Sequence, residues 1–111
     1  DFRNFKKKVS SSYLRKIREK NTAAVLIYNQ TKNGVENYIG ANTLVELAMA
    51  FMWNRKIFLY NDIYAPLADE LLAWDSICLK GNLDKLIFYM KKEIFTANTE
   101  CRPAQLSIFD E

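Results

Sequence analysis

The chain has 111 residues, of which 50% are apolar and 14% aromatic, and its formal net charge is +3. This composition excludes a disordered chain and predicts one domain with its own hydrophobic core. No apolar run approaches the roughly 20 residues of a membrane span and no signal peptide is visible, so we expect a cytoplasmic protein without a membrane partner. The chain contains no histidine, which excludes Ser-His-Asp and Cys-His catalysis within it. Its two cysteines lack metal-ligand spacing, and we expect neither a metal nor a cofactor.

The positive charge is concentrated at the beginning of the chain. Residues 1–20 carry eight basic and two acidic side chains, a net charge of +6, which leaves −3 for the remainder. Such a segment either attracts a polyanion or forms the solvated, lysine-rich face of a helix. It lacks the interleaved aromatic residues of a nucleic-acid-binding motif.

Strands alternate with helices along the chain. Ser10-Ser11-Ser12 is expected to separate two short helices, and the almost wholly apolar run that ends at Asn29 predicts a strand covered on both faces. This order predicts an α/β fold with a parallel sheet. The expected helices are 2–9, 12–20, 42–54, 67–74 and 83–95, and the expected strands are 23–29, 56–61 and 76–79.

Three strands are few for a parallel sheet. We therefore expect either that further strands precede Asp1 or that dimerisation covers the exposed edge of the sheet. The periodicity of apolar residues stops after Thr96, so we divide the chain into an α/β domain, residues 1–96, and an extended tail, residues 97–111, in which Pro103 prevents a helix.

The helix expected at 42–54 is unusually apolar. One stripe consists of Leu44, Leu47, Ala48 and Phe51, and a second consists of Val45, Met49 and Met52. Packing on a sheet requires only one stripe. The second stripe predicts a homo-oligomer with this helix at the interface, or packing against a part of the fold that precedes Asp1.

Glu46 is the candidate catalytic residue. It lies near the expected start of that helix, where the helix dipole favours an ionised carboxylate. Such a carboxylate can stabilise or trap the positive charge that develops on a sugar when a glycosidic bond breaks. The alternative is structural, because Thr43-Leu44-Val45-Glu46 has the pattern of a capping box.

Residues 33–50 carry a resemblance to a known family. They read NGVENYIGANTLVELAMA and, together with Val25–Asn29 and Lys56–Leu59, resemble the nucleoside 2-deoxyribosyltransferase-like family, in particular its uncharacterised branch. The resemblance covers roughly residues 12–95. It implies a flavodoxin-like three-layer fold, oligomerisation through helices and a nucleoside or nucleotide ligand, with Glu46 as the nucleophile beside the sugar C1′.

The chain departs from that family at two acidic positions. Thr22-Ala23 stands where the family has an aspartate, and Gly40 stands where it has another acid. Glu36 and Asp62 are the nearest substitutes. An N-glycosidic transferase, a nucleotide N-glycoside hydrolase and a non-catalytic nucleotide binder therefore all remain open. The ligand-binding residues that we expect beside Glu46 are Asn29, Gly34, Tyr38, Gly40, Asn42, Thr43 and Asp62.

The end of the chain suggests a second hypothesis. Gln105-Leu106-Ser107-Ile108-Phe109 resembles the short motif by which bacterial replication and repair proteins bind the DNA sliding clamp. In such a complex Leu106, Ile108 and Phe109 would enter an apolar pocket and Gln105 would fix the orientation. The protein would then be a non-catalytic adaptor. Alternatively, these side chains pack on the body of the protein or on a neighbouring subunit.

Overall fold

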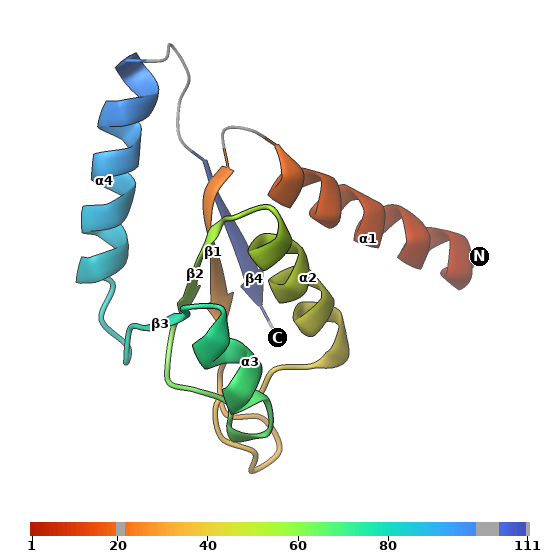
Figure 1. The fold of residues 1–111 in the computed structure, drawn as a ribbon. Helices are drawn as coiled ribbons and strands as arrows, with labels where there is room; N and C mark the ends of the chain where they lie inside the picture. Colours follow the sequence, from red (N-terminus) through yellow and green to blue (C-terminus); the bar gives the residue numbers. More distant parts are fainter. Residues whose placement is uncertain (20–21, 100–104, 111) are drawn as a thin grey trace.

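The computed structural model describes residues 1–19, 22–99 and 105–110, and it combines helices with a central parallel sheet (Figure 1). Most elements lie within a few residues of their expected positions. In chain order they are α1 (Phe2–Arg18), β1 (Thr22–Tyr28), α2 (Ala41–Met52), β2 (Lys56–Leu59), the 3₁₀ turn η1 (Ala65–Leu67), α3 (Ala68–Ala73), β3 (Ile77–Cys78), α4 (Asp84–Thr99) and β4 (Gln105–Asp110).

The sheet has four strands in the order β3-β2-β1-β4, and all neighbouring strands are parallel. β1 is central, and its Val25 pairs with Ile57 of β2 on one side and with Ser107 of β4 on the other. The chain therefore moves from β1 to β2 and β3 in one direction and then crosses to the opposite side of β1. The prediction of an α/β, flavodoxin-like three-layer fold with a parallel sheet is confirmed.

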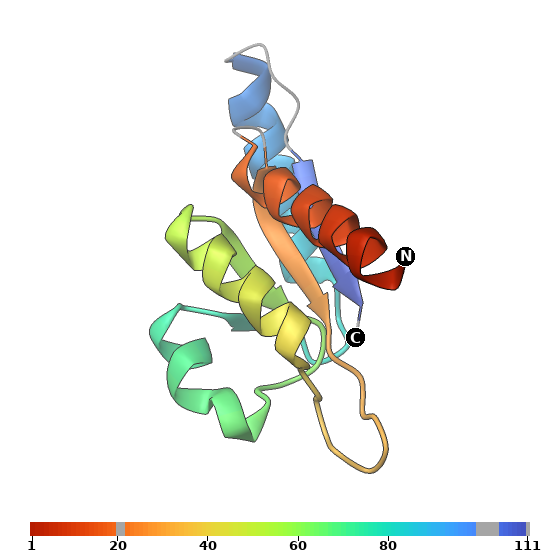
Figure 2. The same cartoon turned by 90° about the vertical axis from the view of Figure 1, so that its right-hand side faces the viewer.

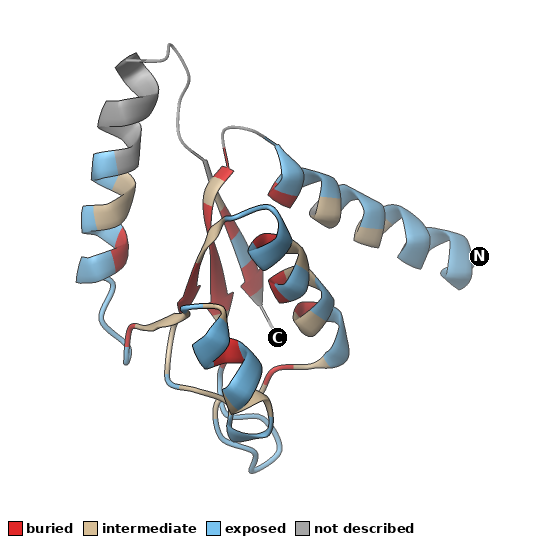
Figure 3. Cartoon of the chain, viewed as in Figure 1, coloured by how far each residue is buried: buried red, intermediate tan, exposed pale blue. Residues whose placement is uncertain are grey.

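Alternating side chains of the strands build a core on each face of the sheet. Val25 and Ile27 of β1 pack on the face that α1, α2 and α3 cover, together with Leu47 of α2. Ala24 and Leu26 point to the other face, where α4 contributes Leu86. Figure 2 shows α1 and α2 on one side of the strands and α4 behind them, and Figure 3 shows that the buried residues gather along β1 and β2.

The first helix is continuous. The expected break at Ser10-Ser11-Ser12 does not occur, because serine costs little in a helix when its side chain is not buried, and none of the three is. Asp1 caps this helix, accepting a hydrogen bond from the Asn4 N–H at 3.0 Å. The consequence is a 17-residue helix whose last turns pack on the sheet through Ile17.

The segment expected as an extended tail, residues 97–111, contributes to the fold where the structure describes it. α4 continues to Thr99, beyond the expected end of the helix at Phe95, and residues 105–110 form β4 within the sheet. β4 supplies the fourth strand and occupies the place beside β1. Pro103 lies outside the described residues.

Candidate strand-end pocket

The carboxyl ends of β1 and β4 define the point at which the strand order reverses. β1 is followed by a segment that leads to α2, whereas its neighbour β4 arrives from the far end of the chain. In open parallel sheets, ligands bind outside the strand ends at such a reversal. The sequence predicts a ligand site at the carboxyl end of β1, and the structure shows that β4 ends beside it.

Asn29 follows β1 directly and organises the loops around it. Its side chain is fully buried, and its Nδ2 donates hydrogen bonds to the carbonyl oxygens of Asp62 at 2.7 Å and Asn37 at 3.3 Å. Its Oδ1 accepts a hydrogen bond from the Asn61 N–H at 3.0 Å. Asn29 therefore ties the loop after β2 to the loop after β1, and its polar atoms are engaged in the fold.

The loop after Asn29 makes a tight turn that presents Lys32. Lys32 and Val35 exchange backbone hydrogen bonds of 3.0 and 2.9 Å across Asn33 and Gly34, both of which have positive φ angles. Gly34 thus serves the turn, and it lies in the exposed part of the loop. The Lys32 ammonium lies 5.7 Å from the centroid of the Tyr38 ring.

Helix α2 begins earlier than the sequence suggests. Its N-cap is Gly40, in extended conformation, and Leu44 donates to the Gly40 carbonyl at 3.0 Å. Thr43 is therefore the third helical residue rather than the cap, and the expected capping box does not form. Glu46 falls in the second turn, not the first, where the effect of the helix dipole is weaker. A capping role no longer explains the glutamate.

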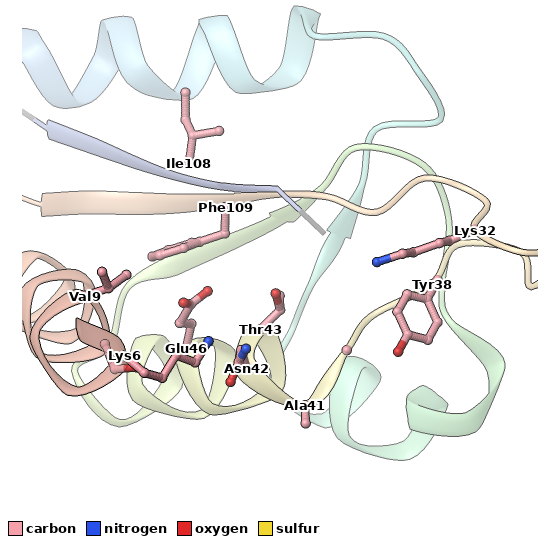
Figure 4. Close-up of a pocket in the computed structure, with 12 residues that line it drawn as sticks. Lys6, Val9, Lys32, Tyr38, Ala41, Asn42, Thr43, Glu46, Ile108 and Phe109 are labelled. Atoms are coloured by element: carbon pink, nitrogen blue, oxygen red, sulfur yellow. The ribbon is translucent and has the colours of Figure 1, made fainter. Parts of the chain in front are cut away.

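A pocket of about 540 Å³ opens between the start of α2, the middle of α1 and the end of β4. In Figure 4 Thr43 and Glu46 point from α2 toward the sheet, and the ring of Phe109 faces them from β4. Lys32 and Tyr38 stand at the opposite end from Lys6 and Val9. The lining residues are Lys6, Val9, Ser10, Lys32, Tyr38, Gly40, Ala41, Asn42, Thr43, Glu46, Ile108 and Phe109.

The pocket brings together five of the eight site residues expected from sequence, namely Tyr38, Gly40, Asn42, Thr43 and Glu46. Asn29 and Gly34 are not among the lining residues: Asn29 is buried between the two loops, and Gly34 belongs to the exposed turn after β1. Sequence reasoning missed the contributions of Lys6, Lys32 and Phe109. Lys6 reaches the pocket because α1 runs along one face of the sheet with its first residues near the end of β4 (Figure 2), and Phe109 reaches it through the pairing of β4 with β1. Neither arrangement is visible in a local pattern, whereas Lys32 lies in the loop directly after β1.

The remaining expected residue, Asp62, is exposed and lies outside the lining of the pocket. Its Oδ1 accepts a hydrogen bond of 2.7 Å from the N–H of Ile63. That bond lowers the pKa of the Asp62 carboxyl, and a hydrogen bond with Cys78 and the charge of Lys80 act in the same direction. Burial raises the pKa of the Cys78 thiol, and so do the hydrogen bond and the negative charge of Asp62.

The residues of the proposed clamp-binding motif lie on both faces of β4. Leu106 packs against the core under α4 and Ile108 is 63% exposed, whereas Phe109 is only 6% exposed and belongs to the core under α1 and α2. Figure 4 shows Ile108 and Phe109 pointing in opposite directions. The side chain of Gln105 lies outside the described residues. The structure therefore shows the alternative in which Leu106 and Phe109 pack on the body of the protein.

Two further features concern the described residues only. No three of their His, Cys, Asp or Glu side chains gather as metal ligands would. None of the helices in ranges 1–19, 22–99 and 105–110 has both the length and the hydropathy to cross a bilayer.

Comparisons of the chain with protein-family models, with curated proteins and with solved structures find no match. The fold and the pocket define an α/β protein with a pocket at the carboxyl ends of its strands.

Proposed function

We propose that the pocket binds a nucleoside or nucleotide and that Glu46 acts on its N-glycosidic bond. The observation that carries this proposal is the placement of Glu46 in a pocket of ligand size at the carboxyl edge of the sheet. Tyr38 offers an aromatic surface for a base at one end of the pocket. The resemblance of residues 33–50 to the deoxyribosyltransferase-like family supports the same ligand class.

The proposed role of Glu46 follows from the positive charge that the sugar develops at C1′ when the N-glycosidic bond breaks. As the bond between C1′ and the base nitrogen breaks, its electron pair leaves with the base, which takes up a proton from water. The Glu46 carboxylate stabilises C1′ or forms an ester bond with it. Water then attacks C1′ and releases the sugar and Glu46 in a hydrolase, whereas a second base does so in a transferase.

The test is release of free base from a panel of nucleosides and nucleotides, followed by chromatography. Glu46→Gln keeps the size of the side chain but removes its charge, so we expect release to fall by about 10³-fold or more. Glu70→Gln, an exposed position on α3, is the matched control and should leave release unchanged. Undiminished release by the Glu46→Gln protein would overturn the catalytic role.

Binding without catalysis is the second outcome to distinguish. If the wild-type protein binds a nucleotide but releases no base, it is a non-catalytic binder rather than a transferase or hydrolase. The adaptor hypothesis receives less support from the structure, because docking on a sliding clamp through Phe109 would require this ring to leave the core.

We also propose that the protein is a homo-oligomer that assembles through α2. Ala41, Val45, Ala48 and Met52 follow one another at spacings of four, three and four residues and are all exposed, Val45 at 54% and Met52 at 75%. This is the spacing of a helix–helix seam, and it contains no charge. The small Ala48 in the middle would allow two such helices to approach closely.

Light scattering coupled to size exclusion tests the assembly. The wild-type chain should have a mass above that of one copy, and Ala48→Glu should reduce it to the mass of one copy. Leu72→Glu, an exposed leucine on α3, is the control for adding a carboxylate to an apolar surface. A wild-type mass of one copy at all concentrations would contradict the proposal.

A further inference from the structure

We propose that the first half of α1 lies on the surface of an anionic lipid bilayer and inserts Phe2 and Phe5 at the boundary between headgroups and acyl chains. This inference goes beyond the proposed nucleoside-binding function and does not depend on it. A helix that lies on a bilayer needs neither the length nor the hydropathy of a spanning helix. The inference therefore replaces the expectation from sequence that the protein has no membrane partner.

An apolar stripe runs along the first half of α1. It consists of Phe2, Phe5 and Val9, whose spacings of three and four residues place them on one side of the helix. Phe2 is 79% exposed and Phe5 is 63% exposed, whereas Val9 is partly buried. Figure 3 shows the first turns of α1 exposed at the margin of the molecule, away from the buried residues of the sheet. Both phenylalanine rings are therefore accessible to a surface that approaches this end of the helix.

The same helix is strongly basic. Between Phe2 and Arg18 it contains seven basic residues and no acidic residue. The basic residues, all of which are exposed, are Arg3, Lys6, Lys7, Lys8, Arg15, Lys16 and Arg18. At 100° per residue, Lys6 and Lys8 fall on opposite sides of the apolar stripe. Interfacial helices bind anionic lipids with this arrangement, because the apolar side chains enter the boundary region while the ammonium groups meet the headgroups.

The charge of the rest of the chain fits this orientation. Residues 1–20 have a net charge of +6, whereas the remainder of the chain has −3. A negatively charged bilayer therefore attracts the α1 end of the protein and repels the remainder. The protein would approach the surface with α1 in front.

A nucleic acid is the other polyanion that a basic helix can bind. Proteins that bind single strands stack the bases on aromatic side chains along a basic groove that follows the backbone. Phe2 and Phe5 instead project from one convex helix. Binding to the phosphates of a duplex needs the basic residues but not the two rings. The exposure of both rings therefore favours a lipid surface over a nucleic acid.

Sedimentation with lipid vesicles tests the inference. The probes are vesicles of phosphatidylcholine alone and vesicles that also contain about 30% phosphatidylserine. We expect the 111-residue chain to partition at least about tenfold more strongly into the anionic vesicles. An increase in salt from about 0.1 M to about 0.5 M should weaken this partitioning at least about tenfold, because salt screens the charges.

Two double variants separate the rings from the charges. Phe2→Ala/Phe5→Ala should reduce partitioning into the anionic vesicles at least about tenfold, because two rings no longer leave water. Lys7→Gln/Lys8→Gln should reduce it at least about fivefold. Lys6 stays unchanged in both proteins because it lines the strand-end pocket.

Helix α4 supplies matched controls. Phe88→Ala removes a ring that is 74% exposed, and Lys85→Gln/Lys91→Gln removes two exposed positive charges. Neither change should alter partitioning by more than about twofold, because these side chains lie outside the proposed contact. Circular dichroism establishes that each variant is folded.

Three results would overturn the membrane contact. The first is equal partitioning into neutral and anionic vesicles, or no partitioning into either. The second is undiminished partitioning of the Phe2→Ala/Phe5→Ala protein, because the rings would then play no part. The third is tighter binding to a single-stranded oligonucleotide than to the anionic vesicles, which would identify α1 as a nucleic-acid surface. Each of these results leaves the nucleoside-binding proposal as it stands.

Discussion

Asn29 and Asn61 hold each other through two hydrogen bonds, one in each direction. The backbone N–H of Asn61 donates to Asn29 Oδ1 at 3.0 Å, and Asn61 Nδ2 donates to the carbonyl oxygen of Asn29 at 2.7 Å. The pair joins the carboxyl ends of β1 and β2, from which the two loops beside the pocket begin. We infer that the shape of the pocket depends on residues that never touch the ligand.

Replacing Asn29 by leucine should destabilise the protein by about 2–4 kcal/mol, because the buried groups that Asn29 now satisfies would lose their partners. Urea denaturation measures the change. Gln30→Leu, at the exposed neighbouring position, is the control and should cost about 0.5 kcal/mol or less. A similar, small cost for both variants would show that Asn29 does not hold the loops.

The two neighbouring side chains of β4 should respond very differently to truncation. Phe109→Ala should cost about 3–5 kcal/mol, since its ring is buried in the core under α1 and α2. Ile108→Ala should cost well under about 1 kcal/mol because its side chain is mostly exposed. Thermal denaturation of the two variants compares them directly. Equal effects would be incompatible with the alternation of a strand.

Arg55 fastens the end of α1 to the segment between α2 and β2. Its Nε donates to the carbonyl oxygen of Ile17 at 3.0 Å, and its Nη2 donates to those of Arg18 and Glu19 at 3.0 and 2.8 Å. Arg55→Met should cost about 1–3 kcal/mol. Arg55→Lys should restore little, because one ammonium cannot reproduce the planar fork of donors.

The free energy of unfolding of each Arg55 variant can be compared with that of Lys7→Met, which removes an exposed cation from α1. If α1 is held mainly by its apolar contacts, Arg55→Met and Lys7→Met will lower the free energy of unfolding by similar, small amounts. That result would contradict the role of the Arg55 guanidinium. Proteolysis within α1 gives an independent readout, since loss of the fastening should expose this helix.

Cys78 should react slowly with alkylating reagents. Its thiol pKa lies above the ordinary value of 9.0, so less thiolate is present near neutral pH than for a solvated cysteine. In a Cys101→Ser background, Asp62→Asn should accelerate iodoacetamide alkylation at pH 8, because Asp62 contributes to the raised pKa. Asp69→Asn, on the exposed side of α3, should leave the rate unchanged. An unchanged rate in Asp62→Asn would contradict the contact.

Asp62 should also contribute to the stability of the protein in acid. Its folded-state pKa lies below the ordinary value of 3.8, so its contribution is present above 3.8 and disappears as the pH falls through the lowered pKa. The difference in urea midpoint between wild type and Asp62→Asn should therefore shrink between about pH 5 and pH 2. If the difference in urea midpoint stays constant over that pH range, the negative charge of Asp62 does not contribute to stability, and the effect of Asp62→Asn comes from the introduced amide group.

The sequence predicts the fold class because β1 and β2 are apolar runs between amphipathic helices. It misses β4 because that strand mixes polar and apolar residues on both faces. Ser107, buried with an unpartnered hydroxyl, lies on the same face as Phe109, and Ile108 is exposed. Residues 105–110 therefore lack the alternation of polar and apolar side chains that predicts a strand. Only pairing with β1, which lies far away in the sequence, gives this segment its structure.

The sequence predicts only those pocket residues that lie close together in the chain. Glu46, Thr43 and Tyr38 come from one continuous stretch, so a local pattern can place them near a strand end. Lys6 reaches the pocket only because α1 continues through its serines and its first turns lie near the end of β4. The start of α2 is shifted because Gly40, which has no side chain, acts as the N-cap in place of the expected asparagine or threonine.

The pairing of Val25 with Ser107 also bears on the order in which the molecule assembles. Contacts between such distant positions raise the contact order and slow the search for the native topology. On a ribosome, β1, α2 and β2 would emerge long before their outer neighbour. Until that neighbour arrives, Glu46 would lack the aromatic wall opposite it, so binding competence is expected to be acquired late in biogenesis rather than with the first compact intermediate.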